Sequence, residues 1–422
     1  MTEQVASLPS PGRYRWRVPL VLGITVVIAY LDRINITLAL PLIAEQFQWS
    51  EAELQRNGGL LMSMFYVGYG LSGLLLSPFA AALGPRRGVV TILVLASLFT
   101  ALGAYLSQFL LLFAASRVLL GVAEGPHFPL GGMAVRHWFP AGERSRANSL
   151  LFAGVFVAVI SGPLLLVPLM HSFGWRAAFL VLAIAGLGLS VPLVLRFVRD
   201  TPGDDPRIPT PERTWLEAHI EPGGDTGPAM RYPLYLFRNT DFLLLLAVGT
   251  LSNIVTIGLT SWIPTYLTHN LGVQYEQLTW LASLPYLSGL LGLAFWSHLG
   301  DRSNRRGLIA ALGFLLLSGL IYIAFTSEIV AVTISAMVLA VFCASAYTSS
   351  EYAFAQRIIP ARHIAAGIGL FNGISIVAGG SLAPILASGL LSEGGGHSLA
   401  LLVLLAIATA VLMAILGRRQ AY

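Results

Sequence analysis

The residues best suited to chemistry in this sequence are charged side chains inside long apolar runs. Asp32 and Arg33 are neighbours in the first run, and Arg117 and Glu124 lie seven residues apart in a later one. Burying a charge within a membrane segment costs roughly 2.5–3.5 kcal/mol, so each such residue needs an explanation. Arginine offers a carboxylate a fixed fork of donors, and a desolvated carboxyl group takes up a proton more readily than one in water. These residues therefore predict a site for an anion and for protons.

Helical geometry predicts in which directions these four side chains point. Neighbours on a helix point about 100° apart, so Asp32 and Arg33 must find partners on different helices or in a wet cavity. Arg117 and Glu124 return to one face, separated by about 10 Å of rise. We expect Arg33 and Arg117 to hold a substrate carboxylate while Asp32 and Glu124 load protons. The alternative is a set of structural ion pairs. His127, one turn from Glu124, is expected to be packed and hydrogen-bonded rather than a proton relay.

The runs that hold these residues are long enough to cross a membrane as helices. The chain has 422 residues, of which 56% are hydrophobic and 11% are charged, whereas soluble domains carry about 25% charged residues. About 20 apolar residues in a helix cross roughly 30 Å of hydrocarbon, and continuous runs differ from the alternation of barrel strands. We expect twelve spans, near residues 18–42, 58–83, 88–107, 109–135, 147–170, 175–198, 241–268, 277–299, 307–326, 329–354, 363–390 and 398–416.

The arginines predict the orientation of these spans. All 25 basic residues are arginine, and with the N-terminus inside the cell 21 of them fall on the inner side, with only Arg56 and Arg176 in outer loops. Because inner loops are enriched in positive charge, we expect both termini in the cytoplasm and the protein in the plasma (inner) membrane. The net charge of +5 is spread between apolar runs, which does not indicate a nucleic-acid partner. The single cysteine, Cys343, cannot form an intramolecular disulfide.

An internal repeat divides the chain into two halves. Arg87 and Arg306, Pro140 and Pro360, and a glycine-proline and an alanine-proline pair recur at nearly the same offset along the chain. Such parallel repeats place a substrate site near the membrane midplane between the halves. We expect a short helix near residues 211–220. The predicted segments are an N-terminal tail (1–17), a six-helix half (18–198), a cytoplasmic linker (199–240), a second six-helix half (241–416) and a C-terminal tail (417–422).

One loop resembles the signature of the major facilitator superfamily. The sequence from residue 299 to residue 306 is similar to the family pattern G-x-L-x-D-R-x-x-R-R, with Asp301, Arg302, Arg305 and Arg306 at the gating positions. The counterpart in the first half keeps the arginine pair but has Ala81 where the family has aspartate. The resemblance implies an all-α membrane protein with twelve transmembrane helices in two pseudo-symmetric six-helix halves.

Within that superfamily, the chain resembles the anion:cation symporters. The similar segments are residues 30–35 (Tyr-Leu-Asp-Arg-Ile-Asn), Arg117 and Glu124 followed by Gly-Pro, and residues 211–216 in the linker. This resemblance implies proton-coupled uptake of a small organic carboxylate by alternating access. It also places Tyr30, Tyr69, Ser349, Tyr352 and Asn372 in the substrate site, and Asn253 is added because the offset of the repeat matches it to Arg33. Polar packing between helices is the alternative for these residues.

Several alternatives remain for function and substrate. A proton-driven exporter of an organic acid or drug is the nearest one, and a channel or a membrane enzyme would be a different class. We expect no enzyme, no cofactor and no metal, because no H-E-x-x-H motif, phosphate-binding loop or cysteine cluster is found. We expect a monomer. The apolar stretch 152–160 favours an anion with few hydroxyl groups. Glu351 could bind a cationic group, pair with Arg357 or reach cytoplasmic water.

Overall fold

The computed structural model describes residues 12–220, 233–269, 283–388 and 396–421, and every regular element among them is helical. Long apolar sequences form these helices because each backbone group finds its partner within the same segment. The first helices are α1 (Arg17–Phe47), α2 (Glu51–Ala82), α3 (Gly84–Leu106), α4 (Leu110–Glu124), α5 (His127–Trp138), α6 (Arg144–Phe173), α7 (Trp175–Ala185), α8 (Val191–Phe197) and α9 (Thr210–His219). They continue as α10 (Thr240–His269), α12 (Leu284–Ser303), α13 (Arg306–Thr326), α14 (Val330–Thr348), α15 (Glu351–Ile358), α16 (Ile364–Ser388) and α17 (Gly396–Gln420).

Among the described residues, ten helical segments are long and apolar enough to cross a membrane. They correspond to ten of the twelve predicted spans. The predicted fourth span consists of two shorter helices, α4 and α5. The predicted eighth span corresponds to α12, and the first residues predicted for that span lie outside the described residues. The expected short linker helix is α9.

The break between α4 and α5 follows from Gly125-Pro126. Proline has no amide hydrogen, so the carbonyl oxygen of Val122 loses the donor that a continuous helix would give it. The hydroxyl of Ser72, on α2, donates to that oxygen at 2.5 Å. The α4 helix therefore ends at Glu124, and its free carbonyl is satisfied from a neighbouring helix.

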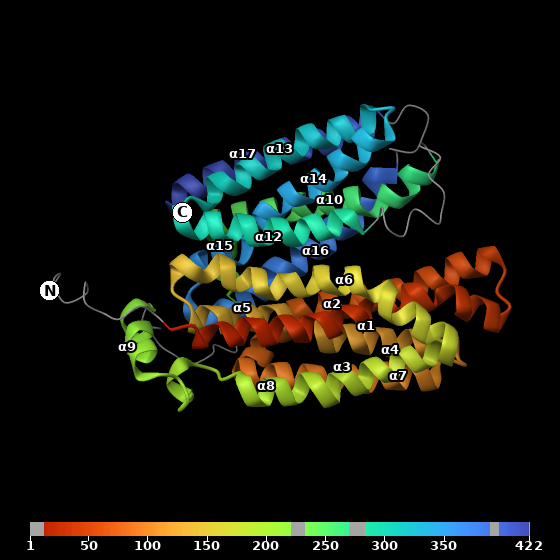
Figure 1. Cartoon of the computed structure of the whole chain (residues 1–422), viewed down its shortest axis with the longest axis horizontal. Coiled ribbons are helices and arrows are strands. Elements are labelled where there is room, and N and C mark those ends of the chain that lie inside the picture. The colour runs from red at the N-terminus through yellow and green to blue at the C-terminus, as the bar shows by residue number, and fades with distance from the viewer. Residues whose placement is uncertain (1–11, 221–232, 270–282, 389–395, 422) are drawn as a thin grey trace. The chain divides into compact units, whose positions relative to one another are not determined.

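By their contacts, the residues divide into two compact units, each described by itself. The first comprises residues up to 233 together with Ile359–Gly369, and the second comprises Leu234–Ile358 and Leu370–Tyr422. The same pairs of helices pack in both units (Figure 1). The α2 helix packs on α4 as α12 does on α14, and α3 packs on α4 and α7 as α13 does on α14 and α17. The α6 and α16 helices begin at Arg144 and Ile364, which matches the offset of the repeat found in the sequence.

Glycines bring α2 and α4 into backbone contact in the first unit. A Cβ atom at Gly121 would lie 2.1 Å from the carbonyl oxygen of Phe65, and one at Gly68 would lie 2.1 Å from that of Val118. Small residues at helix interfaces permit such close approach within membranes. The crossing fixes the height and rotation of α4, the helix that carries Arg117 and Glu124.

The linker is docked on the first unit through α9. The Glu212 carboxylate is buried and accepts hydrogen bonds from the amides of Tyr14 (3.0 Å) and Arg15 (3.1 Å). The Arg15 guanidinium contacts Glu212 and Glu143, at 2.9 Å each. A side chain of the linker thus caps the start of the first membrane helix, which is distant in sequence.

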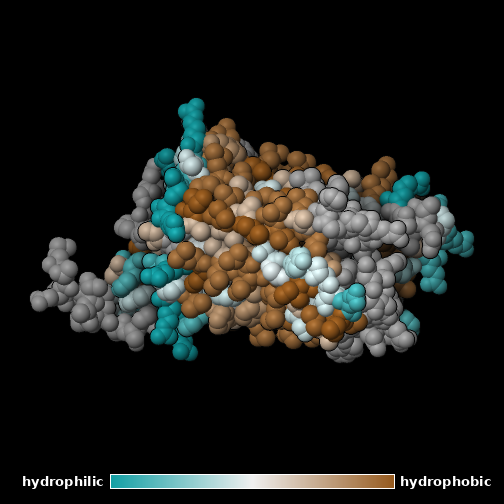
Figure 2. All heavy atoms as spheres, turned by 90° about the horizontal axis from the view of Figure 1, so that it is seen from above, coloured by the Kyte–Doolittle hydropathy of each residue, from teal (hydrophilic) through white to brown (hydrophobic). Residues whose placement is uncertain are grey.

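The outer faces of the spans are apolar. Large side chains such as Leu98 (55% exposed), Ile184 (68%) and Leu404 (62%) point outward. On the face seen in Figure 2, hydrophobic residues cover the middle of the helices and hydrophilic ones gather toward their ends. Exposing such an apolar band to water is unfavourable, whereas the hydrocarbon of a bilayer accommodates it.

Candidate functional site

An ion pair between α1 and α4 stands at the centre of the first unit's charged residues. The Nη2 atom of Arg33 lies 3.3 Å from Oε2 of Glu124, and the two side chains are 9% and 1% exposed. Aromatic rings surround the Arg33 guanidinium, with centroids at 4.5 Å (Tyr30), 4.9 Å (Phe65) and 4.4 Å (Tyr69). Ring faces attract cations within about 6 Å. The structure thus gathers Tyr30, Arg33, Tyr69 and Glu124 of the predicted site around one point.

Arg117 is a buried cation without hydrogen bonds to the part of the chain that the structure describes. Its side chain is fully buried, and none of its three nitrogens has a partner. The rings of Phe179 and Phe113 lie 5.2 Å and 5.9 Å from its guanidinium carbon, and it interacts electrostatically with Asp32 and Glu124. Buried polar groups are normally satisfied. Five donors held in a fixed fork without an acceptor are therefore suited to bind a carboxylate.

Asp32 points away from Arg33, as the spacing predicted. Its carboxylate accepts hydrogen bonds from Asn35 Nδ2 (2.9 Å) and from the hydroxyl of Thr100 on α3. Asp32 and Glu124 both line a cavity of about 10 Å³, together with His127. That volume is about what one water molecule needs. The two residues thus border one space, which has about the size of a single water molecule.

Two local features raise the free-energy cost of an ionised carboxylate at Glu124. It is the last residue of α4, where the helix dipole disfavours negative charge. Its Oε1 atom has no hydrogen-bond partner among the described residues. Arg33 is the cation that offsets this cost. By contrast, the buried His127 has its Nε2 atom 3.0 Å from the hydroxyl of Thr25, so it is packed and hydrogen-bonded.

The predicted site residues of the second unit lie on α10, α16 and the break between α14 and α15. Asn253 faces α16, because a Cβ atom added at Gly379 would lie 2.6 Å from the Cβ atom of Asn253. Ser349 is buried and donates to the carbonyl oxygen of Ala346 at 2.9 Å. The buried ring of Tyr352 lies 6.5 Å from that of Phe371, and the next residue on α16, Asn372, is half-buried.

Glu351 begins α15 directly after that break. It forms no hydrogen bond or ion pair with any residue that the structure describes, and the pairing with Arg357 considered from the sequence is not observed. One turn earlier, the hydroxyl of the buried Tyr347 also lacks a partner among the described residues. Sequence reasoning noted Glu351 but missed Tyr347, because an aromatic residue in an apolar run is normally core.

The signature loop behaves differently in the two units. In the second, Arg306 contacts Asp301 at 2.6 Å with both side chains buried, while Arg302 and Arg305 are exposed. In the first, the residue that precedes Arg87 by the same five positions is Ala82. The missing aspartate is therefore replaced by Ala82, and its assignment to Ala81 was wrong by one residue.

Two repeated helical units with apolar outer faces and buried charges are typical of a membrane transporter. The family model of the Major Facilitator Superfamily matches residues 22–274 and 263–421. The chain therefore belongs to this superfamily, and it is a transporter rather than an enzyme. The fold predicted from the sequence is confirmed.

Curated relatives are similar over most of the chain. A probable sulfoacetate transporter, SauU of Cupriavidus necator, is 28% identical over 69% of this chain and 67% of its own length. A probable galactarate/D-glucarate transporter, GarP of Escherichia coli, is 27% identical over 74% of each chain. The hexuronate transporter of Bacillus subtilis is 26% identical over 67% of this chain and 64% of its own. These relatives agree with the resemblance to anion:cation symporters.

Solved structures share the fold. The human organic anion transporter MFSD10 matches with a TM-score of 0.73 and 17% identity, covering 96% of this chain and all of its own. The proton:xylose symporter XylE matches with a TM-score of 0.72 and 17% identity, covering 95% of each chain. At this identity, the likeness concerns architecture only.

Proposed function

We propose that this protein is a proton-coupled symporter that takes up a small organic carboxylate by alternating access. The proposal places it in the plasma (inner) membrane with both termini in the cytoplasm, and it invokes no metal or cofactor. The observation that carries it is Arg117, a fully buried guanidinium whose donors lack partners among the described residues, beside two buried carboxyl groups.

The ion pair between Arg33 and Glu124 supplies the coupling. While Glu124 is ionised, it occupies the Arg33 guanidinium at 3.3 Å. A proton on Glu124 removes that negative charge, so Arg33 becomes available to an incoming carboxylate. Arg33 and Arg117 then bind the anion together, and proton and anion enter as a unit. Asp32 is the second proton-binding group, linked to Glu124 by the small cavity that they share.

Aromatic and polar groups complete the proposed contacts. Tyr30 and Tyr69 border Arg33 and can donate to the anion through their hydroxyl groups. In the second unit, the residues proposed to contact substrate are Asn253, Ser349, Tyr352 and Asn372.

The class of substrate is a small organic acid. The relatives are carriers of sulfoacetate, galactarate or D-glucarate, and hexuronate by name. Each of these compounds bears at least one carboxylate. Residues 152–160 are apolar apart from Gly154, which favours the less hydroxylated members, so sulfoacetate is the first compound to test.

Proteoliposomes with an imposed pH gradient test the proposal. We expect the protein to accumulate sulfoacetate or another of these acids when the interior is alkaline. The Glu124→Gln variant should exchange substrate across the membrane but no longer accumulate it. Full accumulation by Glu124→Gln would remove Glu124 from the mechanism. Accumulation only when the interior is acidic would instead indicate the exporter alternative.

The same variant should change the pH dependence of binding. In the wild type, affinity should fall as pH rises, because deprotonated Glu124 competes for Arg33. Glutamine carries no charge at any pH, so anion binding by Glu124→Gln should be nearly independent of pH. Isothermal titration at several pH values measures this. Parallel pH profiles for the two proteins would contradict the competition.

A further inference from the structure

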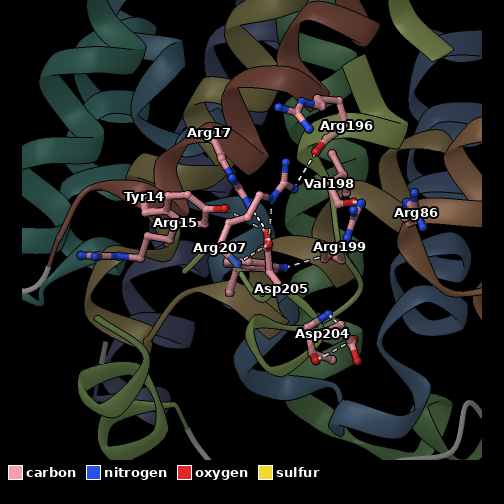
Figure 3. A network of polar contacts seen from close by, with 12 residues as sticks. Tyr14, Arg15, Arg17, Arg86, Arg196, Val198, Arg199, Asp204, Asp205 and Arg207 are labelled. Carbon is pink, nitrogen blue, oxygen red and sulfur yellow. Dashed lines mark hydrogen bonds and ion pairs between the residues drawn. The ribbon is translucent and has the colours of Figure 1, made fainter. Parts of the chain in front are cut away.

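A cluster of arginines surrounds the last turn of α8, apart from the buried charges of the proposed transport site. Arg86 and Arg199 both donate to the carbonyl oxygen of Leu195 at 2.9 Å. Arg207 donates to the carbonyl oxygen of Arg196 at 2.6 Å (Figure 3). The final carbonyls of a helix lack internal donors and carry partial negative charge, so cations gather there. This explains why the cluster forms, but each guanidinium has five donors and uses few of them here.

The cluster contains more positive charge than its acids neutralise. Arg17 and Arg207 both pair with Asp205. Within the ranges that the structure describes, Arg86, Arg196 and Arg199 form no ion pair. Partial burial, together with the nearby charges of Arg86 and Arg207, lowers the pKa of Arg199.

The acid that would balance Arg87, the neighbour of Arg86, is missing from this unit. In the second unit, Asp301 neutralises Arg306, but Ala82 stands at the matching place in the first. The Oδ1 atom of Asp200 accepts a hydrogen bond from the backbone amide of Arg86 at 2.8 Å. Its role is to cap the start of α3, so the arginine side chains keep donors for another anion.

An apolar groove leads along α8 to this cluster. This groove is shallow and open, and all its lining residues come from the stretch 188–197: Gly188, Leu189, Pro192, Leu193, Leu195, Arg196 and Phe197. From Gly188 to Arg196 the groove follows eight residues, or roughly 12 Å of helix. A Cβ atom at Gly188 would meet nothing within 4 Å. An extended hydrocarbon chain fits this shape, with Arg196 at its end.

We propose that this groove and the arginine cluster bind an anionic phospholipid. Its phosphate contacts Arg196, one acyl chain lies along α8, and Arg86, Arg199 and Arg207 supply the surrounding positive potential. Basic residues near a membrane surface attract anionic headgroups, at about 1 kcal/mol for each residue. A free phosphate ion would use the arginines but not the apolar groove, so the continuity of the two favours a lipid.

Purified protein in nanodiscs of defined composition tests this proposal. We expect discs containing phosphatidylglycerol to raise the melting temperature above that in phosphatidylcholine alone, and native mass spectrometry to show retained phosphatidylglycerol. Arg196→Gln should weaken lipid retention about fivefold. Gly188→Leu should weaken it by filling the groove while leaving every charge in place. Matched controls are Arg238→Gln and Gly319→Leu, both exposed, and these should retain lipid as the wild type does.

Each contrary result would overturn the proposal. Equal stabilisation by phosphatidylcholine would exclude headgroup recognition. Equal stabilisation by inorganic phosphate would leave an anion site without a lipid. Unchanged lipid retention in both Arg196→Gln and Gly188→Leu would place any bound lipid elsewhere. None of these outcomes depends on transport, so the test is independent of the proposed function.

Discussion

In the proposed mechanism, two carboxylates compete for one arginine of the first unit. Glu124 and an external carboxylate would both bind Arg33, and only the protonation of Glu124 decides between them. Arg117 has no such internal competitor at hydrogen-bond distance among the described residues. A purely structural ion pair would satisfy both cations, because a buried charge without a partner is costly. Arg33 has a carboxylate partner and Arg117 has no hydrogen-bond partner among the described residues. This difference fits a role in anion binding better than a purely structural role.

Arg117→Lys tests the need for a planar fork. Lysine keeps the charge but binds as a point donor rather than a bidentate one. Since a hydrogen bond to a charged group contributes about 1.5–3 kcal/mol, the loss of one should weaken anion binding by at least about tenfold. Titration calorimetry with the transported acid measures the change. Arg56→Lys, at an exposed position of the predicted outer side, is the control, and equal affinities for all three proteins would exclude Arg117 from binding.

At the scale of helices, periodicity and composition predicted most elements but not their interruptions. Apolar runs determine where spans occur, and the arginine clusters mark where they end. The break after Glu124 depends on Pro126 together with a hydroxyl from α2, and the contact of Asp32 with Thr100 joins two helices that are not consecutive in the chain. Hydropathy carries no signal for such contacts. Asn35, which also binds Asp32, lay within a segment that the sequence singled out.

The backbone contact between α2 and α4 should be sensitive to a single methyl group. In Gly121→Ala the new Cβ would lie 2.1 Å from the Phe65 carbonyl oxygen, and overpacking of this kind costs about 1–3 kcal/mol. We expect a lower melting temperature in detergent and weaker transport. Gly59→Ala, on the same α2 helix with open space around it, should melt like the wild type. Equal melting of both variants would show that the helices can separate without cost.

Docking of the linker should depend on Glu212. In Glu212→Ala the Arg15 guanidinium loses one of its two carboxylates, and two amides lose their acceptor. Removing one partner of a buried pair costs about 3–5 kcal/mol, so tryptic cleavage within residues 199–220 should become much faster. Glu217→Ala alters an exposed residue of the same helix and should be cleaved at the wild-type rate. A resistant Glu212→Ala protein would mean that α9 is held by other contacts.

At the scale of the molecule, the two units share a fold but carry different sets of buried charged residues. The repeat was readable from landmarks at one constant offset, because repeated helices need the same turns at the same spacing. The buried cations and carboxyl groups of the site are confined to the first unit among the described residues, apart from Glu351. Within the same described ranges, the paired aspartate and arginine of the signature loop occur only in the second. Sequence identity between the halves could not have shown which residues diverged for function.

Asp301→Asn tests the division between the units. It would replace the carboxylate that contacts the fully buried Arg306 by a neutral amide, and removing one partner of a buried charge pair costs about 3–5 kcal/mol. We expect a lower melting temperature and slower transport, with the affinity for the anion unchanged. Glu328→Gln changes an exposed acid of the same unit and serves as the control. A loss of affinity in Asp301→Asn would mean that the loop also takes part in binding.

The hydroxyl bridge from Ser72 to the carbonyl left free by Pro126 ties α4 to α2 right beside Glu124. With glycines holding the same two helices together, α2 and α4 must shift as one body. Arg33 belongs to α1, so we expect that breaking its bond with Glu124 displaces α1 against that body. Spectroscopic labels on α1 and α2 should therefore report the arrival of a proton as a change in separation, even before any anion is present.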